Sequence, residues 1–412
     1  MKLVFKNISE LVTLEAVRQK QGRRIQESDL SIIKNAAVVV ENGQILWLGE
    51  KKKLPRSFAA KSKDIDVKGL NLMPGFVECH THSIYAGSRS QEFEQRNRGV
   101  SYQEIAAKGG GILSTMRSTR SSSKQALKTL LQARIDLFVQ QGVTTLEIKS
   151  GYGLELKSEI KCLEVLKSVF DIEIVPTFLG AHAVPPEFSS ASEYLKFLAG
   201  SVLPLVKKKR LSPRVDIFIE RGFFSFDESL DYLQVAKELG FQLVVHADQL
   251  SLCGGADAAI AMGAVSADHL LQVSDDNIQN LAKSEVTCVL LPAADLYMRS
   301  AYPRARALIE AGARVALATD YNPGSSPTQD LSLVGLLARL EMKMTLPEVI
   351  SAYTVGAAFA LSKQDSCGAL IPGFAANFFT TPLAWDQLFY SVGHPVAAEV
   401  FSNGKRVFKR VN

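Results

Sequence analysis

Residues 122–151, SSKQALKTLLQARIDLFVQQGVTTLEIKSG, contain a helical pattern followed directly by a strand pattern. In 122–141 apolar side chains recur at helical spacing, and Gly142 follows as a stop signal. The next run, 143–149, is rich in the β-branched residues that favour strands. This stretch therefore predicts one helix and one strand in immediate succession.

The same alternation of strand and helix patterns recurs to about residue 360. Apolar runs that we expect to form buried strands end near His82, Ser150, His182, Glu220, His246, His269, Ala293 and Asp320. After the first interval these ends are about 23 to 38 residues apart, which suits one strand plus one helix. Eight such units predict an α/β protein with a TIM-like (β/α)8 barrel over 71–364. The rival fold, a doubly wound sheet, would carry a glycine fingerprint that this sequence lacks.

Both ends of the chain have a different sequence pattern from the middle. Residues 1–70 alternate apolar runs with turn residues, and Asn42-Gly43 marks a hairpin. Residues 365–412 have a similar pattern, with a second Asn-Gly pair at 403–404. We therefore expect the two ends to pair into one small β-sandwich domain beside the barrel.

The composition excludes several classes of protein. Hydrophobic residues make up 47% and charged residues 22% of the 412 residues, as in ordinary globular proteins. The net charge of +5 is spread without a dense basic stripe, so we expect no nucleic-acid partner. No apolar stretch approaches the roughly 18 residues that span a bilayer, so we expect no membrane partner. Five scattered cysteines and the lack of a secretory signal pattern predict a reduced, cytoplasmic protein.

The histidines are the strongest functional signal. Of six in the chain, five lie at the C-terminal ends of predicted barrel strands: His80, His82, His182, His246 and His269. In a (β/α)8 barrel the functional site lies where those ends meet. A single histidine on a strand is often only a core residue, but five at equivalent positions indicate a common site.

Four residues in this set have the chemistry of a metal centre. His80 and His82 are two apart on a strand, so both imidazoles point to the same face and can reach one ion. His246 and Asp320 each end an apolar run. Three imidazoles and one carboxylate suit Zn²⁺ or iron with a position left for water, and such an ion supplies hydroxide near neutral pH.

Several longer motifs carry a family resemblance. They are PGFVECHTHSIYAGSRSQEFE from residue 74, LEIKSGYGL from 146, FLGAHAVP from 178, VVHADQLSLCGGADAA from 244, GAVSADHLL from 263 and ATDYNPGSSPT from 318. Together they resemble the amidohydrolase superfamily and, within it, the imidazolonepropionase family of histidine degradation. The combination is much more specific than the histidine pair alone.

The resemblance implies roles for particular residues. Metal ligation falls to the same four residues: His80, His82, His246 and Asp320. Contacts with substrate or product are implied for Arg89, Tyr152, His182, Gln249, Asn322, Gly324 and Ser325. His269 would line the reacting centre, and the general base stays open among Asp320, His182 and His269.

Three of the implied contacts have alternatives in the sequence. Arg89 stands near Glu92 and Glu94, so a surface salt bridge is an equal alternative to carboxylate binding. Tyr152 lies between glycines in SGYG, which also suits a plain turn. Gln249 occupies a position where some relatives carry a carboxylate, and an amide cannot act as a general base at neutral pH.

The implied reaction is hydrolysis of the ring C–N bond of 4-imidazolone-5-propanoate to N-formimidoyl-L-glutamate, the third step of L-histidine degradation. The expected partners are this small-molecule substrate and, by base rate, a second copy of the chain in a homodimer. Relatives with two metals place a lysine at the end of the fourth strand, where this chain has Glu220 and Arg221, whereas Lys149 ends the second strand. We therefore expect one Zn²⁺ or Fe³⁺ per subunit.

Two other functions are alternatives for a sequence of this kind. A deaminase of a purine, pyrimidine or related heterocycle belongs to the same superfamily and would use the same metal and barrel. A silent binding protein with this fold would be expected to have lost ligands, and all four are present.

Overall fold

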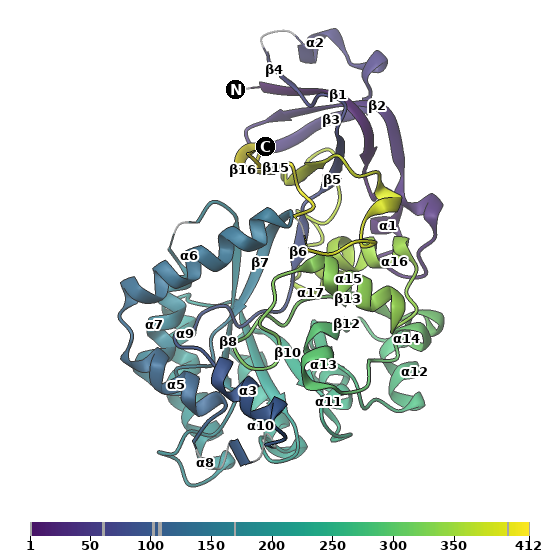
Figure 1. Cartoon of the computed structure of the whole chain (residues 1–412). Coiled ribbons are helices and arrows are strands. Elements are labelled where there is room, and N and C mark those ends of the chain that lie inside the picture. The colour runs from purple at the N-terminus through teal and green to yellow at the C-terminus, as the bar shows by residue number, and fades with distance from the viewer. Residues whose placement is uncertain are drawn as a thin grey trace.

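The computed structural model describes residues 2–59, 62–100, 104–105, 109–168, 170–393 and 395–411. Figure 1 shows two parts: a β-sheet built from both ends of the chain, and below it a ring of strands surrounded by helices. Both termini lie beside the sheet (Figure 1). The ring carries the predicted site, and the sheet adjoins the opposite side of the strands.

Eight parallel strands form the ring in sequence order. They are β6 (Phe76–Glu78), β7 (Val143–Lys149), β8 (Glu173–Ala181), β9 (Arg214–Ile219), β10 (Gln242–Ala247), β11 (Ser266–His269), β12 (Thr287–Leu290) and β13 (Arg314–Leu317). An isolated parallel bridge between Thr81 and Tyr321 joins the two ends of the ring beyond β6 and β13. The predicted (β/α)8 barrel is confirmed.

Five of the eight predicted strand ends lie within one residue of the observed ends. The other three strands stop three or four residues early: β6 at Glu78 before His82, β12 at Leu290 before Ala293, and β13 at Leu317 before Asp320. The strand expected to end near Ala293 stops at Leu290, and Ala293 lies in the helix that begins at Pro292. The apolar run continues across the boundary because both the strand and the first turn of the helix are buried. Proline at the first helical position, where its missing N–H costs nothing, was the signal for the break.

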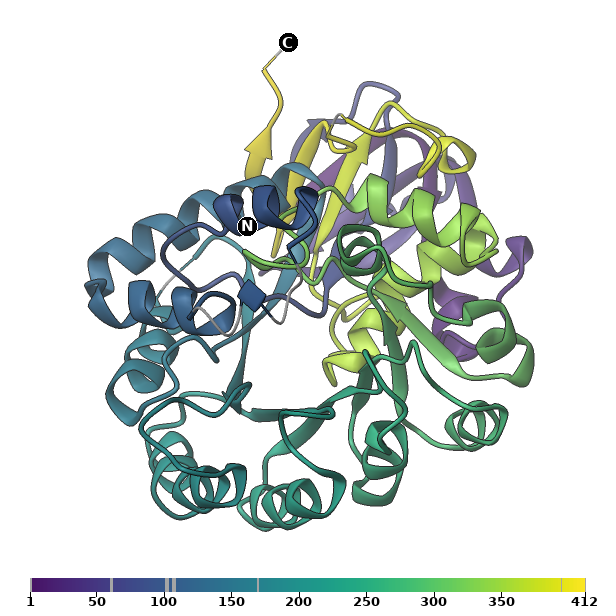
Figure 2. The same ribbon diagram turned by 60° about the horizontal axis from the view of Figure 1, so that its bottom comes forward.

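Helices and helical turns cover the outside of the barrel (Figure 2). They are α3 (Ser90–Asn97), α5 (Ile112–Ser121), α6 (Lys124–Gln140), α7 (Leu156–Leu166), α8 (Ala191–Phe197), η3 (Leu198–Val202), α9 (Leu203–Lys208), α10 (Phe226–Glu238), α11 (Gly255–Met262), α12 (Asp275–Lys283), α13 (Pro292–Met298), α14 (Ala305–Ala311), α15 (Leu331–Leu340), α16 (Leu346–Ser351), η4 (Ala352–Gly356) and α17 (Ala357–Ala360). No helix within the described ranges has both the length and the apolar character that crossing a membrane requires.

Helix α6 illustrates how the local sequence sets these elements. Ser123 precedes the helix, and its hydroxyl accepts the backbone N–H of Ala126 at 3.1 Å, so it caps the first turn. Gly142 follows the helix with φ +93°, a conformation that glycine adopts without strain. The helix and strand predicted from 122–151 are both confirmed.

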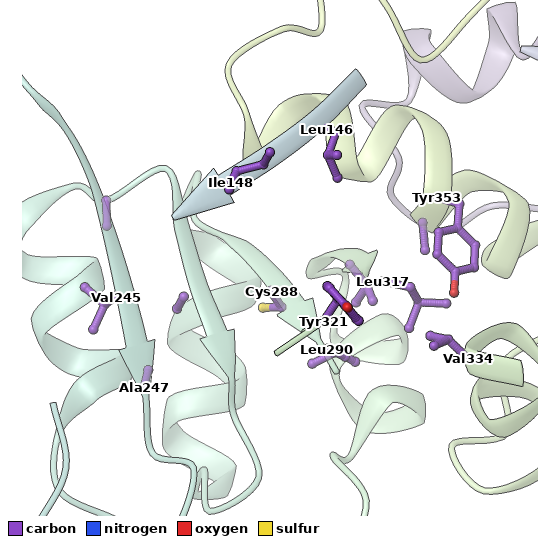
Figure 3. Packing of buried hydrophobic residues seen from close by; sticks show 14 of the residues in the cluster. Leu146, Ile148, Val245, Ala247, Cys288, Leu290, Leu317, Tyr321, Val334 and Tyr353 are labelled. Carbon is purple, nitrogen blue, oxygen red and sulfur yellow. The ribbon is translucent and has the colours of Figure 1, made fainter. Parts of the chain in front are cut away.

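Alternation along the strands sorts side chains between the helices and the barrel interior. On β7, Leu146 and Ile148 belong to the large apolar cluster shared with the helices, whereas Glu147 and Lys149 do not. Figure 3 shows Leu290 and Leu317 of neighbouring strands beside Tyr353 and Val334 from helical segments. Each such buried side chain stabilises the fold by about 1.5–3 kcal/mol relative to an exposed one.

The terminal sheet draws its strands from both ends of the chain, as predicted. Its order is β16-β15-β14-β5-β1-β2-β3, with β4 paired to β1. The elements are β1 (Lys2–Val12), α1 (Glu15–Gln19), η1 (Glu27–Leu30), β2 (Ile32–Glu41), β3 (Gln44–Glu50), η2 (Lys51–Lys53), α2 (Arg56–Ala59), β4 (Ser62–Asp66), β5 (Asn71–Pro74), β14 (Phe378–Thr381), η5 (Trp385–Gln387), β15 (Glu399–Ser402) and β16 (Lys405–Lys409). All eight strands belong to one hydrogen-bonded sheet.

Both predicted hairpin turns are present in this sheet. Asn42-Gly43 joins β2 to β3 with φ values of +52° and +81°, and Asn403-Gly404 joins β15 to β16 with +50° and +71°. Two residues of positive φ are what this kind of tight turn requires, and Asn-Gly adopts them most readily. The division of the chain into domains at residues 70 and 365 stays a prediction.

Candidate active site

The five predicted rim histidines lie together at the C-terminal ends of the barrel strands. Ring centroids are 4.6 Å apart for His80 and His246, 5.0 Å for His82 and His182, and 5.3 Å for His246 and His269. Because they come from β10, β11 and the segments after β6 and β8, only the closed barrel brings them together. The structure thus joins residues that are almost 190 positions apart in the chain.

Three of these imidazoles can hold one ion. The ligand atoms of His80, His82 and His246 all lie within 4.8 Å of one another, and the Nε2 atoms of His82 and His246 are 3.4 Å apart. Asp320 Oδ1 lies 3.5 Å from His80 Nε2 and 3.3 Å from His82 Nε2. The four residues predicted as metal ligands are therefore neighbours in space.

Carboxylates behind two of the histidines set the direction of their rings. His80 Nδ1 lies 2.6 Å from Asp268 Oδ2, and His246 Nδ1 lies 3.1 Å from Asp216 Oδ1. A carboxylate accepts hydrogen bonds, so each Nδ1–H donates and the lone pair of each Nε2 points into the cluster. This arrangement is typical of histidines that bind a metal.

The donor atoms of the cluster fit a cation. Within the described part of the chain, His80 Nε2 and Asp320 Oδ1 are buried without a hydrogen-bond partner. Burial costs such atoms free energy unless something else contacts them. An ion among imidazole and carboxylate donors would satisfy both atoms, and this donor set suits zinc or iron.

Burial keeps the imidazoles of His80, His82, His182 and His269 neutral. It lowers the pKa of His80, His82 and His182 well below the usual histidine value, and that of His269 to about 3. Burial also raises the pKa of Asp320, against the opposing effect of His269 and His246. Neutral imidazole is the form that binds metals, so His80 and His82 need no deprotonation near pH 7.

The backbone is strained at two site residues. His269 has φ +80° and Asp320 has φ +52°, and neither is glycine. Such conformations cost roughly 1–3 kcal/mol and persist where the surrounding structure enforces them. His269 ends β11 and Asp320 follows β13, and both side chains line the pocket at the rim.

A pocket of about 340 Å³ opens onto the cluster. Ten of the predicted site residues line it: His82, Arg89, Tyr152, His182, His246, Gln249, His269, Asp320, Asn322 and Ser325. His80 is fully buried beneath this surface. Gly324 packs against Arg89, because a Cβ added there would lie 2.0 Å from the guanidinium.

Arg89 combines the two interpretations that its sequence allowed. Its Nε donates to Glu92 at 2.8 Å, so the predicted salt bridge exists. The side chain is nevertheless buried and lines the pocket rather than the outer surface. Glu92 also accepts the backbone N–H of Gly111, so this carboxylate ties Arg89 to the segment before α5.

The segment after Asp320 is a compact turn held by Asn322. Its Oδ1 accepts the backbone N–H groups of Gly324 and Ser325, both at 2.8 Å. Its Nδ2 donates to the backbone carbonyl of Asp320 at 2.7 Å. The amide of Asn322 thus shapes the loop, while Ser325 lines the pocket beside it.

Buried carboxylates hold the loops that carry Tyr152 and Gln249. Glu159 accepts backbone N–H groups on both sides of Tyr152, from Gly151, Gly153 and Leu154. Glu220 accepts the N–H of Leu250 at 2.7 Å, next to Gln249. The backbone bends at Tyr152, and the centroid of its ring lies 5.3 Å from that of His182.

Sequence reasoning missed the residues behind the histidines and much of the apolar lining. Asp216, Asp268 and Glu147 interrupt apolar strands at alternate positions, and that interruption was the available signal. The apolar side of the pocket comes from Ile112, Phe218, Phe223, Leu250 and Met298. No motif marks these residues, since apolar side chains near strand ends also occur in ordinary cores.

Comparisons with known proteins agree with this geometry. The sequence profile described as "Amidohydrolase family" matches residues 71–407. An imidazolonepropionase of Bdellovibrio bacteriovorus is 59% identical over 99% of this chain and 97% of its own length. An imidazolonepropionase of Geobacillus kaustophilus is 42% identical, over 98% and 97% respectively.

Solved structures with the same fold are more distant in sequence. An adenosine deaminase from Xanthomonas campestris with bound zinc has a TM-score of 0.72 at 17% identity, over 99% of this chain and 93% of its own. Guanine deaminase of E. coli has 0.74 at 13% identity, over 99% and 100%. These two support the fold alone. From the profile match and the full-length similarity, the chain belongs to the amidohydrolase family and, within it, groups with the imidazolonepropionases.

Proposed function

We propose that this protein hydrolyses the cyclic amide of 4-imidazolone-5-propanoate to N-formimidoyl-L-glutamate, the third step of L-histidine degradation. The observation that carries the proposal is the 59% identity to an imidazolonepropionase over 99% of the chain. The pocket supports it, because it places polar and cationic side chains around a histidine and aspartate cluster. The planar ring and single carboxylate of this substrate need both kinds of group.

His80, His82, His246 and Asp320 would hold one Zn²⁺ or Fe³⁺ in this proposal. That ion would supply a hydroxide near neutral pH and polarise the carbonyl under attack. The short distances among the donor atoms and the unsatisfied Nε2 and Oδ1 support this assignment. The absence of a lysine at the end of β9 favours a single ion.

Arg89 would bind the carboxylate of the substrate. A guanidinium offers paired donors that match a carboxylate, and a buried one attracts it more strongly than an exposed one. Tyr152, His182, Gln249, Asn322, Gly324 and Ser325 would complete the contacts, with the amide of Gln249 orienting the ring. Glu159 and Glu220 accept hydrogen bonds from the backbone of the loops that carry Tyr152 and Gln249. These bonds support the assignment, since loops held by buried carboxylates lose little entropy on binding.

His269, His182 and Asp320 would carry the proton transfers. A neutral imidazole at His269 can donate a hydrogen bond to the oxyanion that forms when water adds to the carbonyl. The ring C–N bond then breaks, and its nitrogen takes a proton from the Asp320 carboxyl or from a histidine. Burial raises the pKa of Asp320, which supports its part, because its carboxylate accepts a proton more readily than an exposed one does.

The test is to offer freshly prepared 4-imidazolone-5-propanoate to the purified protein. Loss of imidazolone absorbance together with formation of N-formimidoyl-L-glutamate is the expected result. Guanine, adenosine and cytosine are offered in parallel with an assay for ammonia. Ammonia release without ring opening would replace the proposal by a deaminase.

Two further expectations rest on sequence alone. We propose a homodimer as the assembly and the cytoplasm as the location. Light scattering after size exclusion tests the first, with a mass of twice 45.0 kDa expected. Fractionation of the source cells tests the second.

A further inference from the structure

A lysine lies at the centre of the barrel below the candidate metal site. Lys149, the last residue of β7, is fully buried, and its Nζ donates to Glu147 Oε1 at 3.0 Å. The same Nζ lies 3.0 Å from Asp216 Oδ2 and 3.8 Å from Asp268 Oδ2. Asp216 is on β9 and Asp268 is on β11, so the three side chains come from alternate strands and meet inside the barrel.

Two of these carboxylates are the ones that orient metal-site histidines. Asp216 contacts His246 Nδ1, and Asp268 contacts His80 Nδ1. Lys149 therefore links Asp216, which orients the histidine on β10, to Asp268, which orients the histidine after β6. Its backbone N–H also donates to the carbonyl of Thr81, between the two histidines of the pair, at 2.9 Å.

A cation at this place does not help to attract a metal ion. The ammonium of Lys149 is separated from the imidazoles of His246 and His80 by one carboxylate each, so its charge repels a cation at the candidate metal site. Buried ion pairs are weak contributors to stability, because desolvation offsets their attraction. Burial disfavours the charged lysine too, but Asp216, Glu147 and Asp268 outweigh burial and raise its pKa.

We propose that Lys149 is a positioning residue that holds Asp216 and Asp268 so that the Nε2 atoms of His246 and His80 converge on one ion. The inference rests on the metal centre of the proposed function. The lysine touches neither the ion nor the substrate and acts through the two carboxylates. Without it, two neighbouring carboxylates of like charge would lose the group that keeps both in place.

The sign of one measurement separates positioning from simple electrostatics. Removing a positive charge near a cation site should tighten metal binding if charge alone mattered. Loss of positioning should weaken binding, since groups that orient metal ligands typically contribute 10–100-fold in affinity. The two explanations therefore predict opposite shifts of the dissociation constant.

The experiment measures zinc affinity of metal-free protein by competition with a chelator of known affinity. For Lys149→Met we expect the dissociation constant for Zn²⁺ to rise about 10–100-fold. The matched control is Arg214→Met, which removes another buried cation of the barrel interior. Its charge also interacts with Asp216 and Asp268, but its Nε donates to Thr177. The control should keep the wild-type affinity, whatever each variant loses in thermal stability.

A double-mutant cycle tests the route through the carboxylates. In an Asp216→Asn background, Lys149→Met should weaken zinc binding by a smaller factor than in the wild type, because part of the link is already gone. Should Lys149→Met fail to fold, Lys149→Gln replaces it, since an amide can still donate one hydrogen bond to a carboxylate. The same direction of change is expected.

Tighter or unchanged zinc binding in the lysine variant, or equal weakening in Arg214→Met, would overturn the proposal. So would full additivity in the cycle. If the wild-type protein itself binds no zinc or iron, the metal centre of the proposed function fails instead. The two failures are thus distinguishable.

Discussion

The barrel interior and the terminal sheet are both buried, yet they are built from opposite kinds of residue. Below the barrel rim lie six ionisable side chains, each at most 2% exposed: Glu78, Glu147, Lys149, Arg214, Asp216 and Asp268. The terminal sheet instead packs Phe5 against Phe378 and Phe401, with ring centroids 4.9 and 5.1 Å apart.

The contrast separates two uses of burial. Apolar packing stabilises a fold without fixing the direction of any one group, because the hydrophobic effect is not directional. Buried charges cost desolvation free energy, but their contacts fix angles and distances. The apolar terminal sheet therefore stabilises the fold where the chain ends meet the barrel. The ionisable residues of the barrel interior instead orient the groups at the rim.

The largest expected effect is at the rim itself. Asp320→Asn keeps the shape of the side chain and removes its ability to ionise, so kcat should fall by about 10²- to 10⁴-fold. Stability of the metal-free protein should be kept or raised, since a buried carboxylate becomes neutral. Steady-state kinetics and thermal unfolding measure both.

Asp275→Asn is the control, because the Asp275 side chain is exposed and is not one of the proposed site residues. Loss of stability alongside activity in Asp320→Asn would mean that the aspartate serves the fold, and the contrast between the two regions would fail.

The second largest effect is expected in the apolar terminal sheet. Phe378→Ala in the terminal sheet should lower the free energy of unfolding by about 3–5 kcal/mol, because it leaves a cavity among three packed rings. The kcat/KM of the folded fraction should stay at the wild-type value. Urea unfolding with an activity assay at low denaturant tests this, with the exposed Leu340→Ala as control. A change in kcat/KM at full folding would show that the sheet shapes the site.

The third prediction concerns Arg89, a charged group that faces the pocket. Arg89→Ala should mainly raise KM for a carboxylate-bearing substrate, by about 2–4 kcal/mol in binding free energy. Arg98→Ala is the matched control. Arg89 directly precedes helix α3, and Arg98 directly follows it and is exposed. An unchanged KM would leave Arg89 with only its ion pair to Glu92.

The smallest expected effect concerns a buried carboxyl that no partner charge compensates. Burial, with the nearby charge of Asp320, raises the pKa of Asp295 to about 8. In the folded protein this group stays protonated where the unfolded chain ionises, so stability falls as pH rises from about 4 to 8. Asp295→Asn stays neutral in both states and should be more stable than the wild type at pH 8, by about 1–3 kcal/mol.

Urea unfolding of the metal-free wild type and variant at pH 5 and pH 8 measures this difference. The variant should lose less stability between the two pH values. Equal losses would mean that Asp295 ionises in the folded protein as it does in water.

The sequence predicts the rim well because rim positions follow from local patterns. Most apolar runs end at a recognisable place, and the barrel brings these ends to one face. That logic placed His182, His246 and His269 together although no motif links them. The Asn-Gly hairpins were predictable for the same reason, since positive φ at both residues is a local requirement.

The sequence predicts the interior poorly because its contacts are long-range. Nothing near Lys149 indicates that Asp216 and Asp268 complete its environment, since alternate strands meet only after the ring closes. The missed strand end near Ala293 has another cause. There the buried strand and the buried helix start share one apolar run, which periodicity cannot divide.

The most direct test of the central claim is to titrate metal-free protein with Zn²⁺ or iron while following ring opening of 4-imidazolone-5-propanoate. Turnover should be absent at the start and should rise in proportion to bound metal, reaching a plateau near one equivalent per chain. His80→Ala should neither retain the metal nor recover turnover. Full turnover by protein that holds no metal would contradict the account.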